Sequence, residues 1–260
     1  MKNTLKRYIK PVAICSALLV MMFASCKQDD YYIDGGKADP KFKGTILQYL
    51  QSNPAKFDTI AEIVKLAGLE DMFSNEKITF FAPTDEVVRR TIGFVNRPIN
   101  DFYKNRLNQA LFELDKDTIK TLADVPPVIW RKYLLRYVFK GSFVAKDYPQ
   151  LDFGLKELYP GGYFYTYNND LANIGVVYNS VNNVKYTGYR QLSISFVPDA
   201  SNPKQYYPAA VGTSDVQPTN GVVHVLAVAG GWSIGAVETS GAGDLFGFGT
   251  EFWTDVVFNR

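Results

Sequence analysis

The 260-residue sequence contains only two cysteines, Cys15 and Cys26, and a single histidine, His224. Such a thiol-poor chain has no disulfide framework, and it offers no cysteine nucleophile or thiolate metal site in its body. One histidine without a cysteine partner also excludes a zinc centre. The apolar run from Val12 to Ser25 is shorter than the roughly 20 residues that span a bilayer. Because cysteine and histidine are so scarce, we expect no cofactor and a fold that is stabilised by its hydrophobic core without disulfide bonds or metal.

The N-terminus has the form of a secretory signal. Four basic residues and no acidic ones occupy the first ten positions, and the apolar run follows them. Phe23-Ala24-Ser25-Cys26 resembles the bacterial lipobox, in which a cysteine preceded by small residues is acylated and becomes the new N-terminus. The usual Leu three positions before that cysteine is Phe23 here. The sequence predicts a signal peptide at residues 1–25 and lipidation of Cys26.

The charge of the chain changes if this signal is removed. The full sequence carries 28 basic and 26 acidic residues, and loss of four basic residues turns its net charge from +2 to −2. We therefore expect no nucleic-acid partner. Residues 26–41 are polar and predict a flexible tether. Lys27-Gln28-Asp29-Asp30 resembles the charged signals of Bacteroidetes surface lipoproteins, so we expect an outer-membrane anchor with the body facing the cell exterior.

Apolar periodicity divides the remaining chain into a helical and a β-rich part. Apolar residues recur at helical spacing between Phe57 and Val64, after the break at Asn53-Pro54, and Pro126-Pro127 opens a further helix. After about residue 142 the period changes to two. Strands are predicted at 78–81, 163–167, 174–178, 192–197 and 222–228. Helices followed by strands predict an α+β fold.

Three segments, in order, resemble the signatures of fasciclin domains: residues 78–86, 134–141 and 220–226. The resemblance implies a single domain over residues 42–230, with helices packed on a β-sandwich or wedge. Residues 142–220 are longer than is usual in the family, which predicts an insertion at about 179–215. Residues 231–260 form a C-terminal extension, in which 251–258 are predicted to add a strand.

The family-signature residues are interpreted as mainly structural; they are Phe81, Pro83, Thr84, Asp85, Tyr137, Asn220, Gly221 and His224. Thr84 or Asp85 can cap the following helix, and Asn220-Gly221 is a turn able to adopt positive φ. In animal members, adhesion has been attributed to a Tyr-His neighbourhood. Here Val138 follows Tyr137, so that role is not carried over to Tyr137.

Tyrosine provides the best signal for binding. Ten of the 17 tyrosines fall between Tyr148 and Tyr207, interleaved with asparagines. Aromatic rings stack on sugars, and tyrosine also suits protein interfaces. Alternating Tyr163, Tyr165 and Tyr167 are interpreted as half-buried strand residues. The candidate ligand-binding residues lie in the expected insertion, and they are Tyr186, Tyr189, Tyr206 and Tyr207.

The leading hypothesis is a lipid-anchored surface protein that binds an extracellular protein or polysaccharide and catalyses no reaction. A second is an accessory glycan-binding subunit of an outer-membrane transporter complex that imports nutrients. A third is a cryptic hydrolase, since a chain with 26 carboxylates always offers pairs of acidic side chains.

Thr59 and Thr118 each follow an Asp and precede an Ile, which resembles an O-glycosylation signal of exported Bacteroidetes proteins.

Overall fold

The computed structural model describes residues 39–93, 107–227 and 247–260. The chain divides into Met1–Asp39 and Pro40–Arg260, and all the described helices and strands belong to the second unit. The predicted signal peptide, Cys26 and most of the predicted tether lie outside the described residues. Among the described helices, none is both long and apolar enough to cross a membrane.

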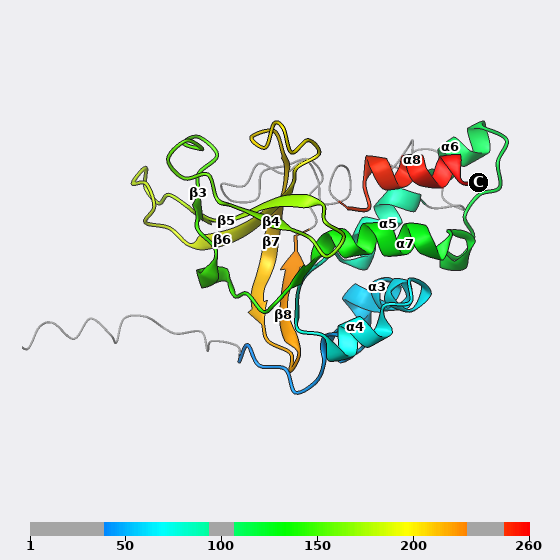
Figure 1. Ribbon diagram of the computed structural model, residues 1–260, viewed down its shortest axis with the longest axis horizontal. Coiled ribbons are helices and arrows are strands. Elements are labelled where there is room, and N and C mark those ends of the chain that lie inside the picture. Colours follow the sequence, from blue (N-terminus) through cyan, green and yellow to red (C-terminus); the bar gives the residue numbers. More distant parts are fainter. Residues whose placement is uncertain (1–38, 94–106, 228–246) are drawn as a thin grey trace, which may run out of the picture. The chain divides into compact units, whose positions relative to one another are not determined.

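Helices predominate in the first half of the described chain, where β1 lies between α4 and α5; strands predominate in the second half, and one helix follows at the C-terminus (Figure 1). The α-helices are α2 (Ile46–Gln51), α3 (Pro54–Leu66), α4 (Glu70–Asn75), α5 (Asp85–Ile92), α6 (Leu107–Glu113), α7 (Pro127–Leu134) and α8 (Thr250–Phe258). The 3-10 turns are η2 (Leu122–Asp124), η3 (Leu135–Tyr137) and η4 (Ala145–Asp147). The strands are β1 (Ile78–Ala82), β2 (Val138–Lys140), β3 (Gln150–Leu151), β4 (Gly162–Tyr165), β5 (Leu171–Tyr178), β6 (Arg190–Phe196), β7 (Tyr207–Val216) and β8 (Gly221–Leu226).

The strands form one curled sheet in the order β2-β1-β8-β7-β6-β5-β3, and β4 also pairs with β5. β1 and β8 run parallel, which places Phe81 opposite His224. The first and last family signatures are therefore neighbouring strands of the sheet. All five residues of β1 are buried, as expected of a strand covered on both faces. The α+β prediction is confirmed, with the helices packed on the sheet.

Sequence periodicity located the first helices correctly. α3 begins at Pro54 and buries the predicted face, with Phe57, Ile60, Ile63 and Val64 fully buried. It ends where Gly68 adopts φ +64°. The amides of Gly68 and Leu69 then donate to the carbonyls of Lys65 and Val64, which satisfies the helix end.

The predicted C-terminal strand is wrong, because Thr250–Phe258 forms helix α8. Aromatic and β-branched residues favour a strand there, but Phe248, Phe252 and Val256 recur every fourth residue and all are fully buried. This spacing gives one helical face. The Phe252 ring lies 5.0 Å from the ring of Trp130 and 5.4 Å from that of Tyr133, both on α7. Packing against α7 therefore decides the conformation.

Two further regions differ in detail from the sequence expectations. The C-terminal end of the predicted tether is fixed to the domain. The amide of Gln217 donates to the carbonyl of Pro40 (2.6 Å), and Lys41 forms an isolated parallel β-bridge with Gln217. Residues 179–215 contain two loops separated by β6, followed by most of β7. The loop between β5 and β6 projects on the side of the sheet away from α6, α7 and α8 (Figure 1).

Candidate binding surface

Asp85 joins the first signature to helix α3. Its Oδ1 accepts a hydrogen bond from the amide of Ile60 (3.1 Å), just after Phe57 breaks the helical geometry of α3 with φ −136° and ψ 16°. Burial raises the pKa of Asp85, and bonds from the amides of residues 58–60 oppose this rise. Thr84 occupies the N-cap position of α5, but its side chain makes no capping bond. The expected cap of α5 by Thr84 or Asp85 is therefore wrong, because the Asp85 carboxylate accepts its hydrogen bond from α3.

Asn220 and Gly221 connect the last signature to the helices. The Asn220 side chain accepts from the amide of Ile46 (2.8 Å) and donates to the carbonyls of Phe73 and Glu76 (both 3.1 Å). Neither residue has positive φ, which corrects the expectation for this turn. Glycine is needed at 221 for another reason, because a Cβ there would lie 1.9 Å from the carbonyl oxygen of Ile78.

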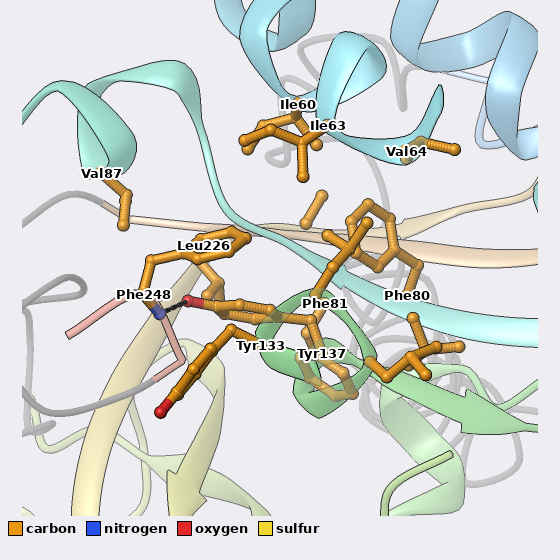
Figure 2. Close-up of a cluster of buried hydrophobic side chains, with 14 of the residues drawn as sticks. Ile60, Ile63, Val64, Phe80, Phe81, Val87, Tyr133, Tyr137, Leu226 and Phe248 are labelled. Carbon is orange, nitrogen blue, oxygen red and sulfur yellow. Dashed lines mark hydrogen bonds between the residues drawn. The ribbon is translucent and has the colours of Figure 1, made fainter. Parts of the chain in front are cut away.

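Tyr137 lies in the core and cannot reach a partner outside it. The side chain is fully buried, and its hydroxyl accepts a hydrogen bond from the amide of Phe248 (3.0 Å), as Figure 2 shows. The two rings lie 5.5 Å apart. Burial raises the pKa of Tyr137. The C-terminal segment therefore covers the signature residue Tyr137.

His224 is a buried hydrogen-bonding residue of β8. Its Nδ1 accepts from the amide of Asp215 (3.2 Å), and its Nε2 lies 3.0 Å from the carbonyl oxygen of Phe143 and donates to it. Burial lowers the pKa of His224. Because both ring nitrogens are engaged with the backbone, this imidazole is not placed to act as a general base.

A hollow of about 350 Å³ lies beside the start of α5, and Asp85, Glu86 and Arg89 contribute to its lining. Its carboxylates already have partners. Asp85 accepts from the Ile60 amide, and Glu86 pairs with Arg89 (3.2 Å) and Arg90 (3.0 Å). These contacts account for Asp85 and Glu86 as structural residues of α3 and α5.

The four candidate tyrosines do not form one exposed surface. Tyr206 is only 8 % exposed, and burial raises its pKa to about 12, so its assignment as a ligand contact does not fit this conformation. Tyr207 is half-buried against the core. Tyr189 is 60 % exposed. Tyr186 is partly exposed and donates its hydroxyl to Asp152 Oδ2 (2.8 Å).

Two of the three tyrosines at 163, 165 and 167 are more exposed than expected, whereas Tyr167 is half-buried as predicted. Tyr163 and Tyr165 of β4 are 41 % and 68 % exposed, and Tyr167 follows the end of the strand. The Tyr163 hydroxyl donates to the carbonyl of Pro203 (3.1 Å), and that of Tyr167 donates to Glu76 (3.0 Å).

The two predicted glycosylation sites, Thr59 on α3 and Thr118, are partly exposed.

Sequence reasoning missed several exposed apolar side chains on the two loops that the Tyr186–Asp152 hydrogen bond joins. They lie in residues 152–160 and 179–189, which we call the loop surface, and are Leu155, Leu158, Val181 and Val184. Val181 and Val184 exchange two backbone hydrogen bonds across Asn182 and Asn183, whose φ angles are 51° and 63°. Two asparagines between valines are a hairpin-turn signal that could have identified this tip.

The chain is similar to known proteins in two comparisons. The fasciclin domain model matches residues 55–228. Among solved structures, one similar chain is titled "Novel Fold Revealed by the Structure of a FAS1 Domain Pair from the Insect Cell Adhesion Molecule Fasciclin I", at 19 % identity and a TM-score of 0.41. The alignment covers 70 % of this chain and 49 % of that one, so this chain spans about half its length.

No curated protein matches the sequence significantly. Fasciclin domains as a family are of a non-enzymatic type and are associated with cell adhesion or binding. The family model covers most of the chain, and its first and last signatures lie side by side as β1 and β8. The chain belongs to the fasciclin domain family.

Proposed function

We propose that the chain is a lipid-anchored binding protein of the outer membrane whose fasciclin domain holds an extracellular partner, protein or glycan, without catalysing a reaction. The anchor is Cys26, and the sequence around it supports export and acylation. The charged residues that follow Cys26 support an outward orientation, and the tether gives the domain reach from the membrane.

The observation that carries this proposal is the loop surface. Its apolar side chains are well exposed: Leu158 by 66 %, Val184 by 56 % and Val181 by 48 %. Single exposed apolar residues are ordinary, but a group on adjoining loops is typical of an interaction site. The bond between Tyr186 and Asp152 joins the two loops. A partner therefore meets a surface that is already formed, which reduces the entropy lost on binding.

A binding array tests the proposal. The full chain, purified in detergent, is applied to immobilised matrix proteins and glycans, and we expect at least one reproducible ligand. Val181→Ser combined with Val184→Ser should weaken that binding about tenfold, because it removes exposed apolar area. Val128→Ser is the matched control, since Val128 is 70 % exposed on α7, outside the loop surface. Unchanged binding by the double variant would contradict the role of the loop surface.

The anchor needs a separate test. Cells expressing the chain are grown with labelled palmitate, and we expect incorporation that Cys26→Ser abolishes and Cys15→Ser leaves intact. Intact cells are then treated with protease. Degradation of the wild-type domain supports the outward orientation, whereas complete protection would place it on an inner face and contradict the proposal.

A further inference from the structure

Tyr186 is held in a backbone conformation that bulky residues avoid. Its φ is +65°, in the left-handed region. The side chain compensates through the hydrogen bond to Asp152 Oδ2 (2.8 Å), which raises the pKa of Tyr186 to about 12. Strained residues fixed by their surroundings are concentrated at binding and catalytic sites. The position of this ring is thus tightly specified although it lies at the surface.

Three tyrosines gather at this point. The ring of Tyr186 lies 5.9 Å from that of Tyr159 and 6.4 Å from that of Tyr178, both nearly edge to face. All three side chains are partly exposed. The group therefore differs from the core aromatic clusters, and we call it the tyrosine cluster. Tyr159 comes from one loop of the loop surface, and Tyr178 ends β5 just before the other.

Positive charge accompanies the cluster. Residues 179–190 contain Lys185 and Arg190 and no acidic residue. The guanidinium of Arg190 lies 4.1 Å from the centre of the Tyr178 ring, and its Nη1 donates to the carbonyl of Gly188 (3.3 Å). Neither cation forms an ion pair with a carboxylate of the described residues. Stacking orients the guanidinium and leaves further N–H groups for a planar anion.

The nearby carboxylates are already occupied. Asp152 Oδ2 accepts from Tyr186, and its Oδ1 accepts from the amides of Gly154 (2.8 Å) and Leu155 (3.1 Å). Glu157 pairs with Lys204. Asp152 and Glu157 stay negatively charged. Among residues 152–160 and 179–190, together with the Lys204 that pairs with Glu157, they are outnumbered by four cations, which are Lys156, Lys185, Arg190 and Lys204, so the net charge here is positive.

We propose that the tyrosine cluster, with Lys185 and Arg190, binds a carboxylate-bearing polysaccharide. The inference rests on the proposed function and names its ligand class. The apolar face of a uronic acid ring packs on a tyrosine ring, its carboxylate pairs with Arg190 or Lys185, and its hydroxyls bond the exposed amides of Asn182 and Asn183. A neutral glycan leaves both cations unused, and a purely apolar protein surface would leave them unpaired.

The test uses polygalacturonate and its methyl ester, which share a backbone and differ in charge. The full chain in detergent should bind the acid at least tenfold more tightly than the ester, and added NaCl should weaken binding to the acid. Arg190→Gln should reduce affinity for the acid about tenfold, because a charge-assisted contact is lost. Tyr186→Gly, which relieves the backbone strain while removing the ring, should reduce affinity for both polymers.

Two controls make the result specific. Arg89→Gln removes an exposed arginine on α5, and Tyr165→Ala removes an exposed ring on β4; each should change affinity less than about twofold. Equal binding of acid and ester, or equal losses in the control variants, would overturn the inference. If the chain binds a protein or a neutral glycan on the array but not polygalacturonate, the ligand class is wrong and the proposed function stands. Binding to nothing contradicts both.

Discussion

Asn220 shows how the side chain of a single signature residue connects separate helices through hydrogen bonds. Its side chain satisfies the amide of Ile46 at the start of α2 and two carbonyls at α4, of Phe73 and Glu76. Asn220→Ala should lower the free energy of unfolding by about 2–3 kcal/mol, because those groups lose their partner. Urea denaturation measures this. Asn202→Ala, in an exposed turn, should cost less than about 0.5 kcal/mol, and equal losses would contradict the assignment.

His224 predicts how stability depends on pH. Burial holds its native pKa below the ordinary value of 6.5, so the unfolded chain binds a proton that the folded one does not. Stability should therefore be fully present above about pH 6.5 and fall as the pH drops below it, by up to about 1.4 kcal/mol per unit. Urea midpoints at pH 7.5, 6.5 and 5.5 measure the slope. No other histidine contributes.

The control for this pH dependence is His224→Gln, which retains hydrogen-bonding groups but does not titrate. Its stability should be lower overall and should fall much less than that of the wild-type protein between pH 7.5 and 5.5, because the other pKa shifts among the described residues belong to tyrosines, carboxylates and Arg136, whose ordinary pKa values lie outside that window. A wild-type protein whose midpoint does not change across the same range would show that the imidazole is not buried in its neutral form.

At this scale the sequence predicted which residues matter better than why they matter. The structural role of His224 follows from a lone imidazole among valines, and the structure confirms its burial. The sequence indicates a turn at Asn220-Gly221 that is able to adopt positive φ, whereas Gly221 is required because of its close approach to Ile78 across the β1–β8 pair. Asp85 was assigned to its own helix but bonds α3. Both errors concern contacts between distant segments, which local sequence patterns do not encode.

Helix α8 is the element whose prediction failed, and it is also the one with the sharpest test. Phe252 is fully buried between Trp130 and Tyr133, while Phe258 on the same helix is 81 % exposed. Phe252→Ala should cost about 3–5 kcal/mol, the usual loss for a buried phenylalanine. Phe258→Ala should change stability by less than about 0.5 kcal/mol. Similar urea midpoints for the two variants would show that α8 does not pack in the core.

Elements with strong periodicity and clear ends were predictable, and those defined by their neighbours were not. α3 has an apolar face, a proline start and a glycine end, so its sequence suffices. α8 is short and rich in residues that favour strands, and only α7 reveals which face is buried. The loop surface falls between these cases, because Val181-Asn182-Asn183-Val184 signals a turn but not the hydrogen bond from Tyr186, two residues later, to Asp152.

At the scale of the whole molecule, the folding unit extends beyond the family-matched residues 55–228. α2 adds the fully buried Ile46 and Leu50, and the C-terminal segment adds Phe248 and Phe252. These four side chains lie at opposite ends of the sequence but belong to the same core cluster. Losing each large buried side chain costs about 2–5 kcal/mol, and a whole domain is stable by only about 5–15 kcal/mol.

A fragment limited to residues 55–228 should therefore lack a cooperative thermal transition, whereas residues 40–260 should unfold in one step. Circular dichroism at increasing temperature and the dispersion of amide NMR signals measure both. Fragments 40–228 and 55–260 separate the two ends, and we expect the greater loss from the first, since it removes the aromatic partners of Trp130, Tyr133 and Tyr137. If the fragment 55–228 melts cooperatively near the midpoint of 40–260, neither end of the chain is needed for folding. The domain would then be stable although Tyr137, without Phe248, is exposed to solvent in that fragment.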